Sequence, residues 1–192
     1  MGRIHGQQKD SLGILGQTYF PGFESALDIC SLKDVFKAFS AKLWWQFHTC
    51  SNLWTQYMRA KYCNGQISHT IITKPHDSST WKRIISGRDK TGQQIRWRIG
   101  KGELLLWHDA WLDDEPLVNS FPEFSHSMIK VNYFFCENEW DVDKLKSVLL
   151  AIIIDEILKV RISYTQEDLA YWALTFDGEF TIKSAWELLR QR

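Results

Sequence analysis

The chain has 192 residues, of which 44% are hydrophobic, and its 23 lysines and arginines are balanced by 23 aspartates and glutamates. This hydrophobic content excludes a disordered chain and provides material for one or two folded domains. The neutral net charge counts against a dedicated nucleic-acid-binding module, because such modules are usually basic, although it leaves room for a local basic patch.

The sequence also argues against a membrane protein and against a disulfide-stabilised secreted one. Its longest apolar run, Val148 to Ile154, is far shorter than the roughly 20 residues that cross a bilayer, and no apolar signal segment follows Met1. The chain has four cysteines, and no two of them form a C-x-x-C pair: Cys30, Cys50, Cys63 and Cys136. We therefore expect free thiols in a reducing compartment, the cytoplasm or the nucleus, and no contact with membranes.

The first predicted helix begins at Ser31, behind a glycine-containing arm, residues 1–30, that we expect to be loosely ordered. Ser31 and Asp34 stand where a capping residue and its partner accept hydrogen bonds from free backbone N–H groups. Six apolar side chains at helical spacing predict one buried stripe: Leu32, Val35, Phe36, Phe39, Leu43 and Phe47. A second helix is predicted over residues 52–62, with four side chains facing the core: Leu53, Trp54, Tyr57 and Met58.

A loop and a short helix are predicted next. Residues 64–78 contain glycine, proline and several serines or threonines, which is typical of a loop. Residues 79–86 have the spacing of a short helix that buries Trp81, Ile84 and Ile85.

The following residues have the pattern of a β-hairpin. Apolar side chains alternate with arginines from Ile95 to Ile99, which is the period of a half-buried strand. The run Gly100-Lys101-Gly102 tolerates the backbone angles of a tight reversal. Leu104 and Leu106 then resume an apolar face, and Trp107 is predicted to lie on the opposite face.

The stretch from residue 82 to residue 101 is the most positively charged part of the chain. It has seven basic side chains, opposed only by Asp89: Lys82, Arg83, Arg88, Lys90, Arg96, Arg98 and Lys101. Such a stretch is either a solvated face or a surface that contacts phosphate groups. We predict that these seven residues contact the backbone of RNA or DNA, weakly.

An acidic, proline-containing crossing, residues 113–140, is the best candidate boundary between two lobes, residues 31–112 and residues 141–192. In the second lobe, Asp141 is predicted to cap a helix whose buried side chains are Leu145, Val148, Leu149 and Ile152. The Asp177-Gly178 turn lies between β-prone runs and predicts a second hairpin. The predicted fold class is therefore α+β, with two small lobes of helices and β-hairpins behind the N-terminal arm.

Five motifs occur in this chain in the same order as in a known family. They are Ser31 to Val35 with Ala41 to Trp45, Leu53-Trp54 with Lys61-Tyr62, Ser79 to Ile84, the pattern W-x-x-G-x-G-x-x-x-x-W-x-D-x-W-L over residues 97–112, and Asp177 to Trp186. Over about residues 12–192 the chain resembles plant LINE-type (non-LTR) retrotransposon reverse transcriptase polyproteins. The resemblance implies a connector between the polymerase core and a zinc-binding segment, whose ligands would lie beyond Trp186, so that this segment would be truncated here.

The chain departs from that family in features that matter for catalysis. Ser25 to Cys30 replace a Gly-rich stretch, and the Tyr-x-Asp-Asp strand whose aspartates hold two metal ions in the polymerase is absent. The sequence also has no Walker loop, nucleophile elbow or metalloprotease helix. We therefore predict no catalytic residues for polymerase, endonuclease or ribonuclease H chemistry, no cofactor and no small-molecule substrate.

Two smaller groups of residues bear on metal binding. His48 with Cys50, or Cys63 with His69, could contribute ligands, but their spacing is not that of a zinc finger and we predict no metal site. An acidic group beside His108 is interpreted as a solvated loop: Asp109, Asp113, Asp114 and Glu115.

The leading hypothesis for function is a non-catalytic fragment of a retrotransposon reverse transcriptase polyprotein that contacts nucleic-acid backbone. One alternative is a protein-interaction or structural module that docks on a protein partner through an aromatic surface. Another is a decayed product that retains no function. Binding to a protein through apolar contacts would be insensitive to salt, whereas contacts to phosphate would weaken as salt rises.

Overall fold

The computed structural model describes residues 31–190, and within this range the chain is a mixed α+β protein. Seven α-helices in the described range accompany two small antiparallel sheets of two strands each. The predicted α+β class is therefore confirmed. The expected N-terminal arm, residues 1–30, lies outside the described residues.

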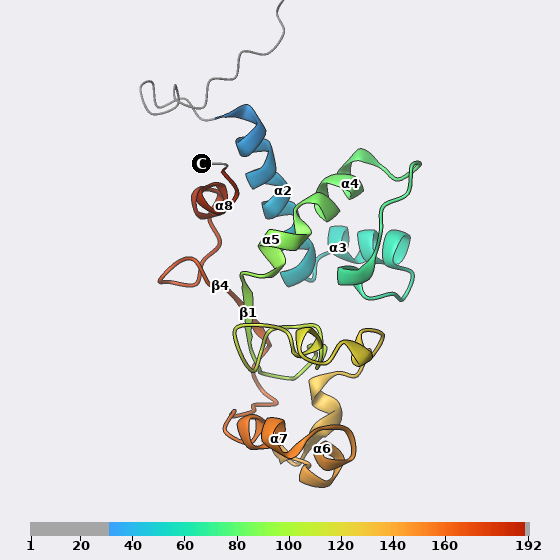
Figure 1. Ribbon diagram of the computed structural model, residues 1–192, viewed down its shortest axis with the longest axis vertical. Coiled ribbons are helices and arrows are strands. Elements are labelled where there is room, and N and C mark those ends of the chain that lie inside the picture. The colour runs from blue at the N-terminus through green and yellow to red at the C-terminus, as the bar shows by residue number, and fades with distance from the viewer. Residues whose placement is uncertain (1–30, 191–192) are drawn as a thin grey trace, which may run out of the picture.

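Helices grouped around α2 (Leu32–Thr49) form the upper half of the molecule in Figure 1. Three others pack against α2: α4 (Ser79–Ser86), α5 (Arg88–Gly92) and α8 (Ile182–Leu189). The short helix α3 (Leu53–Met58) follows α2 directly and contacts it. The buried centre of this group contains large aromatic side chains: Trp44, Phe47, Trp81 and Trp172. Helix α4 has the bounds that the sequence predicted, and it buries Trp81 and Ile84.

The buried face of α2 differs from the predicted apolar stripe. Phe47 is buried, but Leu32, Phe36 and Phe39 are exposed by 86%, 51% and 43%. The buried positions nearest to them are instead occupied by small residues, Ala38, Ser40 and Ala41. The prediction was wrong because neighbouring backbones pack directly on these small residues, and that contact leaves no room for the phenylalanines.

The predicted cap of α2 is also wrong. Ser31 makes no side-chain hydrogen bond to the helix. Asp34 is buried and forms an ion pair with Lys37, at 2.7 Å between Oδ1 and Nζ. The acidic side chain in the first turn is therefore held by a lysine one turn later rather than by the free N–H groups.

The second predicted helix begins as expected but changes geometry midway. Helix α3 continues as a π-helical turn, Arg59–Cys63, so together they cover the predicted range. Met58 is buried, whereas Leu53 and Tyr57 are 83% and 57% exposed. The predicted loop over residues 64–78 contains a 3₁₀ turn, Ser68–Thr70.

Replacing Asn52 with alanine is expected to lower the free energy of unfolding by about 1 kcal/mol. The Asn52 side chain accepts from the Thr55 backbone N–H at 3.0 Å, and Thr55 Oγ1 accepts from the Asn52 backbone N–H at 3.0 Å. Alanine removes the first bond of this capping box and leaves the second in place. Urea unfolding checks the value, and a loss below about 0.3 kcal/mol would show that the cap contributes little here.

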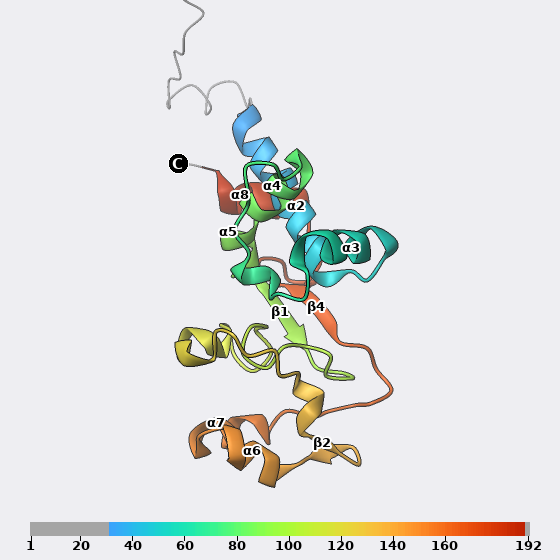
Figure 2. The same ribbon diagram turned by 90° about the vertical axis from the view of Figure 1, so that its right-hand side faces the viewer.

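Figures 1 and 2 show a two-stranded sheet between the helical group and the lower part of the molecule. It pairs β1 (Ile95–Arg98) with β4 (Leu169–Trp172) in antiparallel register. Ile95 and Trp172 lie opposite each other and both are buried. The predicted hairpin, in which β1 would pair with residues 104–107, is therefore wrong.

Other partners hold the residues that follow β1. Asp168 accepts three backbone hydrogen bonds from this segment. The donors are Gly100, Gly102 and Glu103, at 2.7, 2.9 and 2.6 Å. Three side chains beyond the turn are all buried, so they do not alternate as a hairpin strand would: Leu104, Leu106 and Trp107. They are buried together because they belong to the core of the lower part of the molecule.

The second predicted hairpin is wrong for a similar reason. Gly178 has a φ of +74°, and Asp177 Oδ1 accepts from the Glu179 backbone N–H at 3.0 Å, so the predicted turn exists. No strand follows it before α8 begins, however, and the described partner of β4 is β1. The non-local pairing replaces both local hairpins.

The lower part of the molecule has a core of its own. It contains α6 (Val142–Val148), α7 (Ala151–Ile157) and a small hairpin of β2 (Phe135–Cys136) and β3 (Glu139–Trp140). The most deeply buried side chains of this core are Leu106, Trp107, Val131, Phe134, Leu145 and Ile157.

The sequence correctly predicted the start of α6. Asp141 caps this helix by accepting a hydrogen bond from the Lys144 backbone N–H at 3.1 Å. Leu145 and Leu149 are buried, as predicted. Ile152, which was assigned to the same face, lies on α7 and is 74% exposed, because the chain leaves the helix at Leu149.

The crossing between the predicted lobes contains three short 3₁₀ turns: Leu117–Asn119, Pro122–Phe124 and Val131–Phe134. The division into two lobes, residues 31–112 and 141–192, stays a prediction. Elements of the two predicted lobes contact each other, since β4 pairs with β1 and α8 packs against α2. Among the helices described between residues 31 and 190, none is long and apolar enough to cross a membrane.

Candidate functional site

The seven basic residues predicted to contact nucleic acid lie on α4, α5, β1 and the turn after it. Three of them form ion pairs: Arg88 with Asp89, Arg96 with Asp114, and Lys101 with Glu167. Two others have different partners, since Lys82 donates to the Pro75 carbonyl oxygen at 2.6 Å and Arg83 lies 4.3 Å above the Phe36 ring. The contact with nucleic acid stays a prediction.

Lys90 and Arg98 differ from the other five. Both are exposed, and neither has an ion pair or a side-chain hydrogen bond within residues 31–190. They are the basic side chains of the stretch whose charge is most available to an external phosphate. Arg98 is the better placed of the two, because it lies on the sheet.

The β1–β4 sheet presents one face to the solvent. Side chains alternate along a strand, so Arg96 and Arg98 share a face that is opposite to that of Ile95. The register places Tyr171 across from Arg96 and Leu169 across from Arg98. Tyr171 is 42% exposed and Leu169 is 50% exposed. The sheet therefore carries arginine and an aromatic ring on its outer face.

An aromatic side chain that the sequence analysis did not single out extends this surface. Phe176 stands in the turn after β4 and is fully exposed. The turn folds back close to the sheet, since a β-carbon on Gly178 would lie 3.0 Å from Tyr171 Cβ. We call Arg98, Leu169, Tyr171 and Phe176 the sheet surface. The sequence predicted Arg98 in the first hairpin and Tyr171 and Phe176 in the second, and only knowledge of the β1–β4 pairing could have joined them.

The acidic group around His108 does not form one site. Asp113 and Asp114 are exposed, in agreement with a solvated loop, and Glu115 accepts from Asn119 Nδ2 at 3.0 Å. Asp109 departs from the prediction because it is buried, with 7% of its surface exposed. Its Oδ2 atom accepts from the Leu105 backbone N–H at 2.7 Å, which fixes the carboxylate toward the interior.

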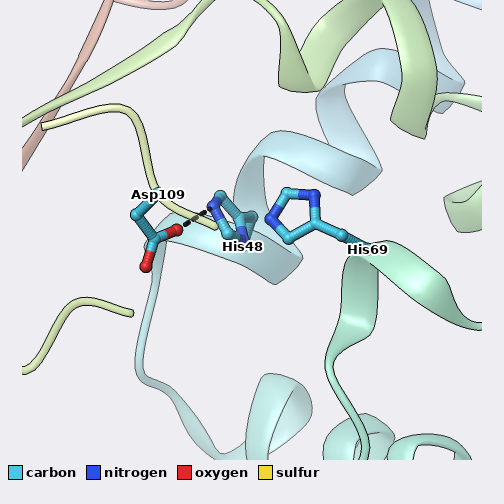
Figure 3. Close-up of side chains that lie close together, drawn as sticks. All are labelled: His48, His69 and Asp109. Atoms are coloured by element: carbon cyan, nitrogen blue, oxygen red, sulfur yellow. Dashed lines mark ion pairs between the residues drawn. The ribbon is translucent and has the colours of Figure 1, made fainter. Parts of the chain in front are cut away.

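Asp109 meets two histidines there, which come from separate elements (Figure 3). His48 lies in the last turn of α2, and its Nε2 atom is 3.2 Å from Asp109 Oδ1. His69 comes from the 3₁₀ turn, and the His48 and His69 rings lie 4.7 Å apart at 81°. One ring nitrogen of each histidine and one oxygen of Asp109 all lie within 4.8 Å of one another. We call these three residues the histidine cluster.

Aromatic rings enclose the histidine cluster. Trp44 stacks on His48 with 5.7 Å between ring centroids, and Trp97 meets the same imidazole edge-on at 5.7 Å. A cavity of about 310 Å³ adjoins the cluster and is also lined by the buried His108. The sequence had paired each histidine with a nearby cysteine, and no local signal joins His48, His69 and Asp109, which the fold brings together.

The electrostatics of the cluster follow from its burial. Desolvation, with a smaller contribution from the neighbouring His48, lowers the pKa of His69 to about 3. Burial would raise the pKa of Asp109, but the hydrogen bond and charge of His48 outweigh this effect and hold it below its usual value. Near neutral pH the cluster therefore contains a neutral imidazole beside an ionised carboxylate.

Comparison with known proteins places the chain beside a longer plant protein. It is 27% identical over 186 residues to a protein of Arabidopsis thaliana named "Putative ribonuclease H protein". The match covers 88% of this chain and 29% of that relative, so the chain spans less than a third of the relative's length. No family model and no solved structure matches the sequence. The finding agrees in part with the resemblance to plant retrotransposon polyproteins.

Proposed function

We propose that this chain is a non-catalytic segment related to plant retroelement polyproteins, and that it contacts RNA or DNA through the sheet surface. The match to a plant protein with ribonuclease H in its name supports the origin. The connector position between a polymerase core and a zinc-binding segment rests on the ordered motifs in the sequence. The observation that supports the contact is the placement of Arg98 across from Leu169 and diagonal to Tyr171 on the exposed face of the β1–β4 sheet.

The chemistry of this surface suits a single strand. An exposed guanidinium attracts phosphate, and exposed aromatic rings stack on unpaired bases of any sequence. Tyr171 offers one such ring on the face that carries Arg98, and Phe176 offers a second in the turn after β4, while the other arginine of the strand, Arg96, pairs with Asp114. With a net charge of zero for the whole chain, binding is expected to be weak and measurable at low salt.

Arg98→Glu is expected to weaken binding of a fluorescently labelled 20-nucleotide RNA or DNA single strand about tenfold at low salt. One lost phosphate contact also lowers the slope of log affinity against log salt concentration by about 1. Tyr171→Ala is expected to cost about 1–3 kcal/mol of binding, the usual contribution of one stacked base. Fluorescence anisotropy in a series of salt concentrations measures both effects.

Lys33→Glu is the matched control, because it makes the same charge change at an exposed position of α2 away from the sheet. It is expected to change affinity by less than about threefold, through net charge alone. Equal weakening by Lys33→Glu and Arg98→Glu, or no change with Arg96→Glu and Arg98→Glu combined, contradicts the contact.

The second candidate function is docking on a protein. The full exposure of Phe176, in the turn that folds against the half-exposed Tyr171, favours it, because exposed apolar surface is typical of interaction sites. Self-association or partner binding that depends on Phe176 but not on salt or Arg98 would support docking and exclude the phosphate contact.

A further inference from the structure

We propose that His48, His69 and Asp109 bind a divalent transition-metal ion, with zinc as the preferred occupant. The proposal is independent of any contact with nucleic acid, since the histidine cluster comes from α2, the 3₁₀ turn and the Asp109 corner, whereas the sheet surface comes from β1, β4 and the turn after β4. It goes beyond the metal ligands considered from the sequence, which paired each histidine with a cysteine.

The first argument is convergence. Three side chains from α2, the 3₁₀ turn and the segment after Trp107 bring one ligand atom each within 4.8 Å of one another, and Figure 3 shows the three side chains gathered together with His48 in the middle. A tetrahedral ion with ligand distances of about 2.0–2.2 Å holds its ligand atoms about 3.3–3.6 Å apart. The three atoms, which lie within 4.8 Å of one another, would therefore close by up to about 1.5 Å on binding. Within residues 31–190 this is the group of histidine, cysteine and acidic side chains that meets such a geometry.

The second argument is unsatisfied polarity. His69 Nε2 is buried and has no hydrogen-bond partner among the described residues, and the buried Asp109 Oδ1 meets only the ion pair with His48 Nε2 at 3.2 Å. Burying a polar atom without a partner costs about 1–3 kcal/mol. A cation at the centre of the cluster would satisfy both atoms and a nitrogen of His48 at once, which no single hydrogen bond between these residues can do.

The third argument is preorganisation. The remaining oxygen of Asp109, Oδ2, is already held by the Leu105 backbone N–H. Trp44 and Trp97 fix the plane of the His48 ring. Metal sites typically orient their ligands through such outer contacts, which are themselves worth about 10- to 100-fold in affinity.

The ligand types select the metal. Two imidazoles and one carboxylate suit zinc and its neighbours in the first transition row, whereas calcium and magnesium prefer oxygen ligands throughout. Three protein ligands beside a cavity of about 310 Å³ leave the fourth position to water. Bound there, the ion would tie the end of α2 to the loop over residues 64–78 and to the corner that contains Asp109.

Metal binding by the whole chain tests the proposal. After treatment with a chelator, the wild type is expected to take up one zinc ion per chain in equilibrium dialysis, and zinc is expected to raise its midpoint of thermal unfolding. Cobalt is expected to give the visible absorption of a four-coordinate ion, and magnesium to give neither effect. A folded wild-type chain without zinc uptake overturns the proposal.

Variants locate the site. His69→Gln is expected to weaken zinc binding by more than about 100-fold, because a lost ligand costs more than a lost outer contact. Its fold is expected to remain, since His69 Nε2 has no hydrogen bond to lose, and far-UV circular dichroism checks this. Asp109→Asn is expected to weaken zinc binding in the same way. If Asp109→Asn does not fold, the result for His69→Gln decides the test.

Two controls separate this site from adventitious binding. His76→Gln removes an exposed histidine outside the cluster and is expected to leave zinc affinity within about threefold of the wild type. Cys50→Ser combined with Cys63→Ser removes the nearest thiols and is expected to retain one zinc ion. Equal affinity of wild type and His69→Gln, or loss of zinc with the thiols, overturns the assignment.

Discussion

Asp168→Asn is expected to lower the free energy of unfolding by about 3 kcal/mol, a large effect for a side chain at the surface of a loop. One Asp168 oxygen accepts from the backbone N–H groups of Gly100 and Gly102, and the other accepts from Glu103. Hydrogen bonds to a charged acceptor are worth about 1.5–3 kcal/mol each when shielded, and those of Asp168 are only partly buried. Asparagine retains one acceptor oxygen, but its NH₂ group faces backbone N–H groups, which also donate. The hydrogen bonds on that side of the side chain are therefore lost.

Glu167→Gln is the matched control, since it neutralises the adjacent carboxylate. Glu167 pairs with Lys101 at the surface, and exposed ion pairs contribute about 0–1 kcal/mol. We expect a loss of less than about 0.5 kcal/mol for this variant. Urea unfolding of both chains, followed by circular dichroism, gives the comparison. Similar stabilities for the two variants would show that the carboxylate of Asp168 does not hold the turn.

Asp168 also explains why the hairpin prediction failed. The alternation from Ile95 to Ile99 correctly identified β1, and the glycines correctly located a reversal of the chain. The partner of β1 could not be predicted, because the hydrogen bonds that Asp168 accepts from the turn and the pairing with β4 are non-local contacts that leave no periodic signal. Local pattern identifies a strand, whereas its neighbour depends on the whole chain.

The helices show the same division between local and non-local information. Helix α4 matched its predicted bounds because its cap, Ser78, and its buried Trp81 and Ile84 all lie within one short segment. The cap of α6 by Asp141 is equally local. The buried face of α2 could not be predicted from apolar spacing, since it depends on which backbones approach the helix.

The candidate sites were harder to predict from the sequence than the fold. The seven basic residues lie within residues 82–101, yet three of them pair with acidic residues, and one of these acidic residues, Glu167, lies far along the chain. The histidine cluster is assembled from three separate segments, and no spacing rule for metal ligands covers such a set. Only the arginine and lysine content of residues 82–101 was a usable local signal.

Gly87→Ala is expected to destabilise the chain by about 3 kcal/mol, although alanine is a better helix former than glycine. Gly87 has a φ of −84°, which any residue can adopt, so backbone strain is not the reason. The added β-carbon would lie 2.3 Å from the Ser40 carbonyl oxygen and 2.9 Å from the Ala41 nitrogen, both in the backbone of α2. Neither atom can move without shifting the helix, so α4 and α2 must separate.

Gly92→Ala tests whether this cost comes from the contact with α2 or from glycine replacement in general. A β-carbon on Gly92 would meet Trp44 Nε1 at 3.5 Å, an ordinary contact. This variant is expected to be neutral or more stable by about 0.5 kcal/mol, because alanine restricts the unfolded chain. A loss of stability in Gly87→Ala alone would show that close backbone contact at Ser40 and Ala41, rather than apolar spacing, determines which face of α2 is buried. The same contact leaves Phe36 and Phe39 exposed.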